Sequence, residues 1–194
     1  MFRGGFYPGD RLIGSVIAGG DIALGDIKGP ALGAPIYDLL GGRCRDYVQC
    51  FLQPGYLPAP RQAGLTSSTD TQTQDCCKQM TSGVENPAAA ALVAQACLAN
   101  GHKFLRLGPN MGGDFFEPRE AARRLLANLR AARGAVGDKL ELMVDLHARL
   151  NPADAIWFCH EAEPLNLFVV EDPIRSEHAH GYRHIRQHVR VPLA

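Results

Sequence analysis

The sequence has 194 residues, of which 46% are hydrophobic and 21% charged, and its 20 basic residues balance 20 acidic ones. This length suffices for one globular domain with a sizeable core, and the neutral charge argues against a nucleic-acid-binding protein, which usually carries a basic stripe. No run of about 18 apolar residues occurs, and residues 1–7 lack the charged and apolar segments of a secretory signal. We therefore expect a cytoplasmic protein that binds neither nucleic acid nor membranes.

The cysteines do not suggest a disulfide framework or a zinc site. They show no CxxC pair and no zinc-ligand spacing, so we expect reduced thiols. The six are Cys44, Cys50, Cys76, Cys77, Cys97 and Cys159.

The first half of the chain changes from helical to irregular. Apolar residues at intervals of three and four predict helix within residues 13–40, interrupted at Gly33 and Pro35. The apolar run at 47–51 predicts a strand. Residues 52–86 show no periodicity and predict a long irregular loop, which in a compact domain is normally functional or disordered.

After Pro87 the pattern predicts alternating helices and strands. Gly101 and Gly134 are expected to end the first two helices, and Asn151 to cap the third. The helices are predicted at 88–100, at 118–133, from 152 and at 178–188, and the strands at 103–107, 140–145, 167–171 and from 190. Short alternation of this kind indicates right-handed βαβ units with a parallel sheet. Because no GxGxxG occurs, a (β/α) barrel is the favoured α/β fold.

Two carboxylates come at the ends of two predicted strands. Asp145 and His147 share one face if the extended backbone continues past the strand, and Glu171 takes the corresponding place on the next strand. In barrel enzymes the catalytic groups lie at these carboxyl ends. The two carboxylates would repel each other unless a cation lay between them, and Mg²⁺, which prefers oxygen ligands, is the natural candidate. The alternative is that both only cap the following helices.

Four segments resemble one known family when taken together and in this order. They are DIALGDIKGPALGAP at 21–35, YDLLGG at 37–42, VDLHARL at 144–150 and VEDP at 170–173. They resemble the mandelate racemase/muconate lactonizing enzyme branch of the enolase superfamily. The Asp-x-His form of the third segment is similar to that of acid-sugar dehydratases of the galactonate and mannonate type.

The resemblance implies a partial (β/α) barrel of that superfamily, preceded by the helical end of an α+β capping domain. The capping part would cover residues 1–46 and the first half of the barrel residues 47–194, with the irregular loop at 52–86. Asp145 and Glu171, which are 26 residues apart, would bind Mg²⁺. The resemblance also implies a third ligand, a Glu at a similar interval, which is expected at about position 197. We therefore expect an incomplete or decayed copy that is inactive alone, from a parent enzyme that forms a homo-oligomer.

The reaction implied by the resemblance is the dehydration of a sugar acid. A metal-bound carboxylate makes the neighbouring α-proton acidic by stabilising the enediolate, after which the β-hydroxyl leaves as water. His147 is the candidate acid or base, because imidazole titrates near neutral pH. Arg106 is the candidate for binding the substrate carboxylate, since guanidinium does so bidentately. The alternatives are a hydrogen-bonded structural His147 and a salt-bridged structural Arg106.

Two other functions stay open from the sequence. The chain could be a non-catalytic pseudo-enzyme that serves as an interaction module. A zinc-binding module is the other, because His180, His184 and His188 recur every four residues on a predicted helix. The alternative for these histidines is a solvated helix face.

Overall fold

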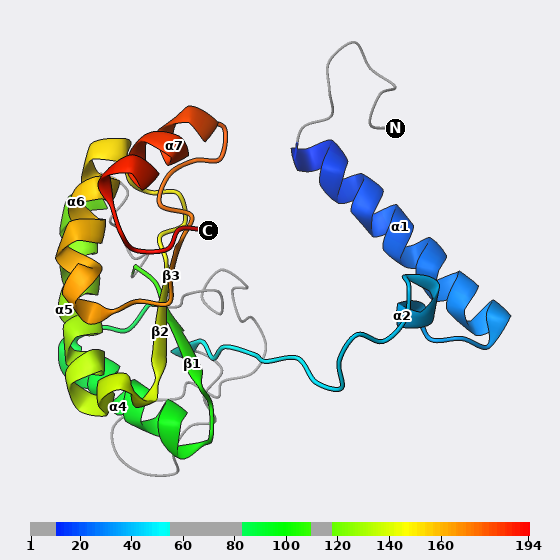
Figure 1. The fold of residues 1–194 in the computed structure, drawn as a ribbon, viewed down its shortest axis with the longest axis horizontal. Helices are drawn as coiled ribbons and strands as arrows, with labels where there is room; N and C mark the ends of the chain where they lie inside the picture. Colours follow the sequence, from blue (N-terminus) through cyan, green and yellow to red (C-terminus); the bar gives the residue numbers. More distant parts are fainter. Residues whose placement is uncertain (1–10, 55–82, 110–117) are drawn as a thin grey trace, which may run out of the picture. The chain divides into compact units, whose positions relative to one another are not determined.

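The structure is a computed structural model that describes residues 11–54, 83–109 and 118–194, and the chain divides into two compact units, 1–49 and 50–194. In the first unit, helix α1 (Arg11–Leu32) is followed by the short helix α2 (Ile36–Leu39) (Figure 1). Gly33 adopts a φ of 62°, and the Ala34 amide donates to the Gly29 carbonyl at 3.0 Å. The predicted interruption at Gly33 is therefore confirmed, since a left-handed residue ends the helix there.

The predicted strand at 47–51 is wrong. These residues form no strand, and Tyr47 and Val48 are exposed. The pairing comes at Leu52, which is buried and forms an isolated parallel bridge to Leu105. The predicted run lacks a buried face, so sheet pairing is confined to one residue beyond it. Of the predicted loop at 52–86, residues 55–82 lie outside the described part of the chain, as do Cys76 and Cys77.

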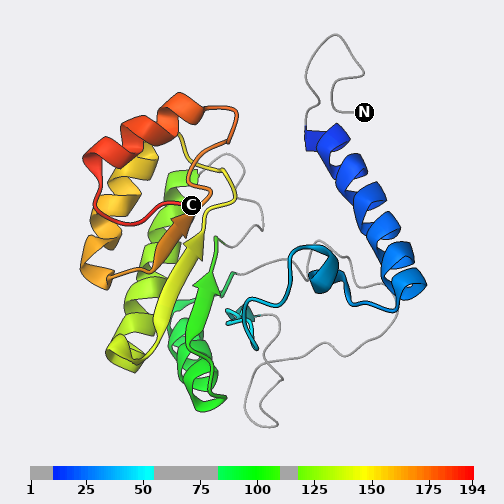
Figure 2. The same cartoon turned by 45° about the vertical axis from the view of Figure 1, so that its right-hand side comes forward.

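The second unit is built on a parallel sheet with the strand order β1-β2-β3 among the described residues. In Figures 1 and 2 the helices α4, α5 and α6 run along one side of this sheet. The elements are α4 (Pro87–Ala99), β1 (Phe104–Leu107), α5 (Pro118–Val136), η3 (Gly137–Lys139), β2 (Glu141–Asp145), α6 (Pro152–Ala162), η4 (Glu163–Leu165), β3 (Val169–Glu171) and α7 (Ala179–His188). The predicted alternation of helices and strands after Pro87 is confirmed, and a short parallel bridge joins Leu193 to Val170 where a fourth strand was expected.

Alternate residues of the strands are buried against the helices. Their side chains are fully buried, as is that of Phe158 on α6. The fully buried strand residues are Leu105, Leu107, Leu142, Val144 and Val170. The intervening residues, Arg106 and Glu171 among them, belong to the opposite face because side chains alternate along a strand. The core therefore lies between the sheet and the helices, and the charged strand residues belong to the opposite face.

Local capping follows the sequence in α4 and α6. The side chain of Asn151 accepts a hydrogen bond from the Asp154 amide at 2.9 Å, as predicted, and Asn86 caps α4 through the Ala89 amide at 2.9 Å.

None of the described helices is long and apolar enough to cross a membrane. Burial raises the pKa of the Cys97 thiol to about 11, and burial followed by the charge of Glu163 raises that of Cys159 to about 12.

The predicted end of α5 at Gly134 is wrong. The helix continues to Val136, and Gly137, with a φ of 58°, supplies the left-handed residue that follows it. Gly134 lies within the helix, where its lack of a side chain costs conformational entropy.

Two glycine substitutions are expected to have opposite effects on stability. A Cβ at Gly134 would meet nothing within 4 Å, so Gly134→Ala should raise the free energy of unfolding by about 0.5–1 kcal/mol. A Cβ at Gly181 on α7 would come within 2.6 Å of Cδ1 of the buried Ile174, so Gly181→Ala should lower it by about 1–2 kcal/mol. Urea denaturation of both variants measures the difference, and equal shifts would contradict the packing of α7 against Ile174.

Candidate functional site

Three strands bring one charged side chain each to the same end of the sheet. All three strands run in the same direction (Figure 2), and Asp145 on β2 is in register with Glu171 on β3. Arg106 on β1 is paired with Met143, two residues before Asp145. The two carboxylates therefore lie on neighbouring strands at their carboxyl ends, where the sequence placed them.

Arg106 lies between the two carboxylates. Its Nη1 is 2.7 Å from Glu171 Oε2 and 3.1 Å from Asp145 Oδ2. The predicted need for a cation between the carboxylates is therefore met in this structure by a guanidinium group. The structure agrees with the salt-bridged alternative for Arg106, and its binding of a substrate carboxylate stays a prediction.

Phe51 completes the surroundings of Arg106. The guanidinium carbon lies 4.5 Å from the centre of the Phe51 ring, an arrangement in which the ring face attracts the cation. From the sequence, Phe51 is predicted only as part of a strand, because an aromatic residue carries no signal for which cation it will contact.

His147 also contacts Asp145, through its backbone and its ring. Its backbone amide donates to Oδ1 at 2.9 Å, and its Nε2 lies 3.1 Å from Oδ2. The extended backbone does not continue as expected, since β2 ends at Asp145 and the φ of His147 is 51°. A left-handed turn therefore brings the imidazole to the carboxylate, and the strand alternation used to predict their proximity does not apply.

These contacts decide the charge of Asp145. Burial by itself would raise the pKa of this carboxyl, but the hydrogen bonds from His147 and the charges of His147 and Arg106 outweigh it and hold the pKa below the usual 3.8. Asp145 is therefore an anion at neutral pH, buried at one end of the sheet.

The helix-capping alternative for the two carboxylates is not what the structure shows. Asn151 caps α6, and the residue before α7, His178, makes no side-chain capping bond. Asp145 and Glu171 make their contacts across the sheet, to Arg106 and His147.

The donor set fits a hard divalent cation as part of a larger coordination shell. Asp145 Oδ2 and Glu171 Oε2 approach one cationic nitrogen within 3.1 Å, so two carboxylate oxygens already converge on a single positive centre. Carboxylate oxygens are what Mg²⁺ prefers. Among the described residues no three His, Cys, Asp or Glu side chains form a complete metal-binding group.

Two buried nitrogens at this site lack hydrogen-bond partners within the described part of the chain. They are Arg106 Nε and His147 Nδ1. A buried donor or acceptor left unpaired costs free energy, so such groups call for an explanation in ligand binding or chemistry. These nitrogens belong to Arg106 and His147, which are the residues predicted from the sequence for substrate binding and for proton transfer.

The predicted histidine cluster on α7 does not form a zinc site. His180, His184 and His188 are exposed, and His188 Nδ1 lies 2.8 Å from the His184 carbonyl oxygen. The rings of His184 and His188 are 4.5 Å apart, but no group of three possible metal ligands occurs in residues 11–54, 83–109 or 118–194. The solvated helix face therefore describes these residues better.

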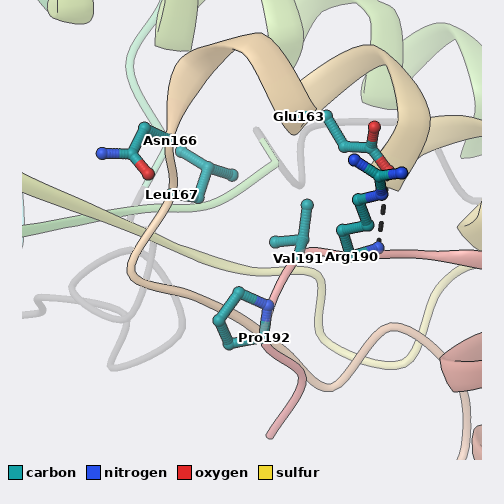
Figure 3. A pocket seen from close by; sticks show the side chains of 6 residues that line it. All are labelled: Glu163, Asn166, Leu167, Arg190, Val191 and Pro192. Carbon is teal, nitrogen blue, oxygen red and sulfur yellow. Dashed lines mark hydrogen bonds between the residues drawn. The ribbon is translucent and has the colours of Figure 1, made fainter.

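A cavity of about 280 Å³ is lined by residues of the segment that precedes β3 and of the segment that follows α7 (Figure 3). None of the predicted site residues lines it. Its lining residues are Glu163, Asn166, Leu167, Arg190, Val191 and Pro192.

Comparison of the sequence with known proteins identifies one family. Residues 88–194 match the family model described as enolase C-terminal domain-like. A D-galactonate dehydratase of Ralstonia pickettii is 28% identical over 194 residues, which are 100% of this chain and 44% of that protein. A D-mannonate dehydratase of Caulobacter sp. is 30% identical over 218 residues, covering 100% of this chain and 47% of that protein. The chain thus spans less than half the length of these relatives.

Solved structures agree on the fold. A member of the enolase superfamily from Salmonella Typhimurium superposes with a TM-score of 0.69 at 23% identity, over 89% of this chain and 42% of that one. A mandelate racemase/muconate lactonizing enzyme-like protein from Roseovarius sp. TM1035 gives 0.66 at 23% identity, over 89% and 40%. The predicted fold class, part of a (β/α) barrel, is confirmed.

Proposed function

Because this chain belongs to the enolase C-terminal domain-like family, we propose that its carboxylate site serves the magnesium-dependent dehydration of a sugar acid. The observation that carries the proposal is the convergence of Asp145 Oδ2 and Glu171 Oε2 on one positive centre. The names of the galactonate and mannonate dehydratases among its relatives support the substrate class. Residues 1–46 are proposed to belong to a capping domain, and residues 47–194 to the barrel.

Asp145 and Glu171 are the proposed magnesium ligands. When bound, the ion would supply positive charge that stabilises the enediolate form of a sugar-acid carboxylate. Arg106, whose Nε has no partner among the described residues, is proposed to bind and orient that carboxylate through its planar fork of donors.

His147 is the proposed acid or base. Asp145 holds its Nε2, which leaves Nδ1 as the ring nitrogen without a partner in the described residues. A ring held in this way has a set orientation, and an imidazole can act as an acid or a base near neutral pH. Loss of the α-proton and of the β-hydroxyl as water leaves an enol, which becomes a 2-keto-3-deoxy sugar acid.

Metal-dependent binding of the sugar acid tests this proposal. We expect the chain to bind D-galactonate or D-mannonate in a calorimeter only when Mg²⁺ is present, and to bind D-galactose, which lacks the carboxylate, in neither case. Glu171→Gln should weaken the metal-dependent binding at least about tenfold, because a neutral amide is a poorer ligand for a hard cation.

The matched control is Glu161→Gln, which removes an exposed carboxylate on α6 that pairs with Arg130. It should bind the sugar acid like the unchanged chain. Because the described residues form no group of three possible metal ligands, we expect binding without turnover by the 194-residue chain. If the affinity for the sugar acid were the same without Mg²⁺ and in Glu171→Gln, the non-catalytic alternative would be favoured.

A further inference from the structure

We propose that Arg106 is a displaceable internal counterion that competes with the metal for Asp145 and Glu171. The inference rests on the proposed function, in which these two carboxylates bind Mg²⁺. It adds that the same guanidinium which joins the two carboxylates in this structure has to leave them when the metal binds.

The contacts of Arg106 carry the first step. A single nitrogen, Nη1, serves both carboxylates, at 2.7 Å from Glu171 and 3.1 Å from Asp145. Both oxygens of Asp145 are already engaged, Oδ1 by the His147 amide and Oδ2 by Arg106 and the His147 ring. A metal ion that takes Asp145 as a ligand therefore meets a side chain whose acceptors are occupied.

The charges carry the second step. A guanidinium group carries a fixed positive charge, so a metal ion at this site would meet a second cation. With side chains only 15% and 7% exposed, Arg106 and Asp145 are poorly screened by water. A guanidinium and a divalent ion on the same pair of carboxylates would repel each other strongly, so the metal and Arg106 bind there in competition.

The surroundings of Arg106 provide what a moving side chain needs. Its Nε is buried without a hydrogen-bond partner among the described residues, so this part of the group is not tied to the protein. The Phe51 ring, 4.5 Å from its guanidinium carbon, is a flat apolar surface on which the group can turn while its charge stays stabilised. Metal binding would thus release the fork of donors that the proposed function assigns to the substrate carboxylate.

Metal affinity measured directly tests the inference without relying on turnover. Titration of the 194-residue chain with Mn²⁺ as a probe for Mg²⁺ is expected to show tighter binding in Arg106→Gln than in the unchanged chain, by about tenfold or more. The matched control is Arg130→Gln, which removes an exposed positive charge paired with Glu161 and should leave the affinity unchanged. Circular dichroism checks that both variants fold.

A measurement on the unchanged chain covers the case in which Arg106→Gln does not fold. The Nε–H resonance of Arg106, assigned through bonds, should shift as Mg²⁺ is added and reach a plateau with the same midpoint as metal binding. Equal or weaker Mn²⁺ binding by a folded Arg106→Gln variant, or a resonance that stays constant while metal binds, would overturn the competition and leave the metal site intact. Absence of metal binding in both the chain and the variant would overturn the metal site and the inference together.

Discussion

Replacing Arg133 with methionine is expected to lower the free energy of unfolding by about 3 kcal/mol. This side chain, 13% exposed, lies near the end of α5 and donates hydrogen bonds to four backbone carbonyls. Nη1 reaches Gly137 at 2.7 Å and Leu140 at 2.8 Å, while Nε reaches Leu165 at 2.9 Å and Nη2 reaches Asn166 at 3.1 Å. One guanidinium therefore joins the end of α5, the start of β2 and the segment that leads into β3.

The expected loss in free energy of unfolding depends on which of the four carbonyls can form a hydrogen bond with water once the guanidinium is removed. Hydrogen bonds to a charged donor contribute about 1.5–3 kcal/mol each, but exposed carbonyls recover most of this from solvent. Gly137 and Asn166 are exposed, whereas Leu140 and Leu165 are buried. Two bonds that water replaces poorly give the expected loss of about 3 kcal/mol, and methionine preserves the apolar stem.

Arg130→Met is the matched control three residues earlier on the same helix. Arg130 pairs with Glu161 at 2.7 Å, but both side chains are about half exposed, so its loss should change the free energy of unfolding by less than about 1 kcal/mol. Urea denaturation of the two variants measures the difference. A loss at Arg133 no larger than that at Arg130 would show that the four carbonyls do not depend on the guanidinium.

The elements that local chemistry determines could be predicted from the sequence. Asn151 followed by Pro152 predicts a helix start because the side chain can cap the amide three residues on, and it does so at 2.9 Å. Gly134 misled the prediction because an interior glycine and a terminal glycine look alike in sequence. The left-handed residue after α5 is Gly137. Arg133, which binds the Gly137 carbonyl, also binds those of Leu165 and Asn166, and these two contacts belong to the tertiary structure.

The part of the site that depends on strand alternation and strand direction could be predicted from the sequence. Both rules bring Asp145 and Glu171 to the same end of a parallel sheet, and the register confirms them as neighbours. The lateral order β1-β2-β3, which brings Arg106 within reach of both carboxylates, is a property of the assembled sheet. The left-handed φ of His147 likewise has no sequence signal, since glycine is the residue that usually marks such a turn.

Asp145→Asn is expected to lower the free energy of unfolding by about 3 kcal/mol at pH 7, because it removes the more buried of the two negative charges that compensate the guanidinium of Arg106. The side chain of Asp145 is 7% exposed and contacts both Arg106 and His147. Asparagine keeps the shape and an acceptor for the His147 amide but removes the negative charge. The remaining pair, Arg106 with Glu171, is more exposed and stabilises less.

The pH dependence gives this prediction its sign. The folded-state pKa of Asp145 lies below the ordinary value of 3.8, so its contribution is fully present above that value and is lost as the pH falls through the folded pKa. The difference in free energy of unfolding between the unchanged chain and Asp145→Asn should therefore be largest at neutral pH and shrink below about pH 4. Asp138→Asn, at a side chain 90% exposed, is the control and should stay within about 0.5 kcal/mol at every pH. A difference for Asp145→Asn that is independent of pH would mean that lost shape, and not lost charge, accounts for the effect.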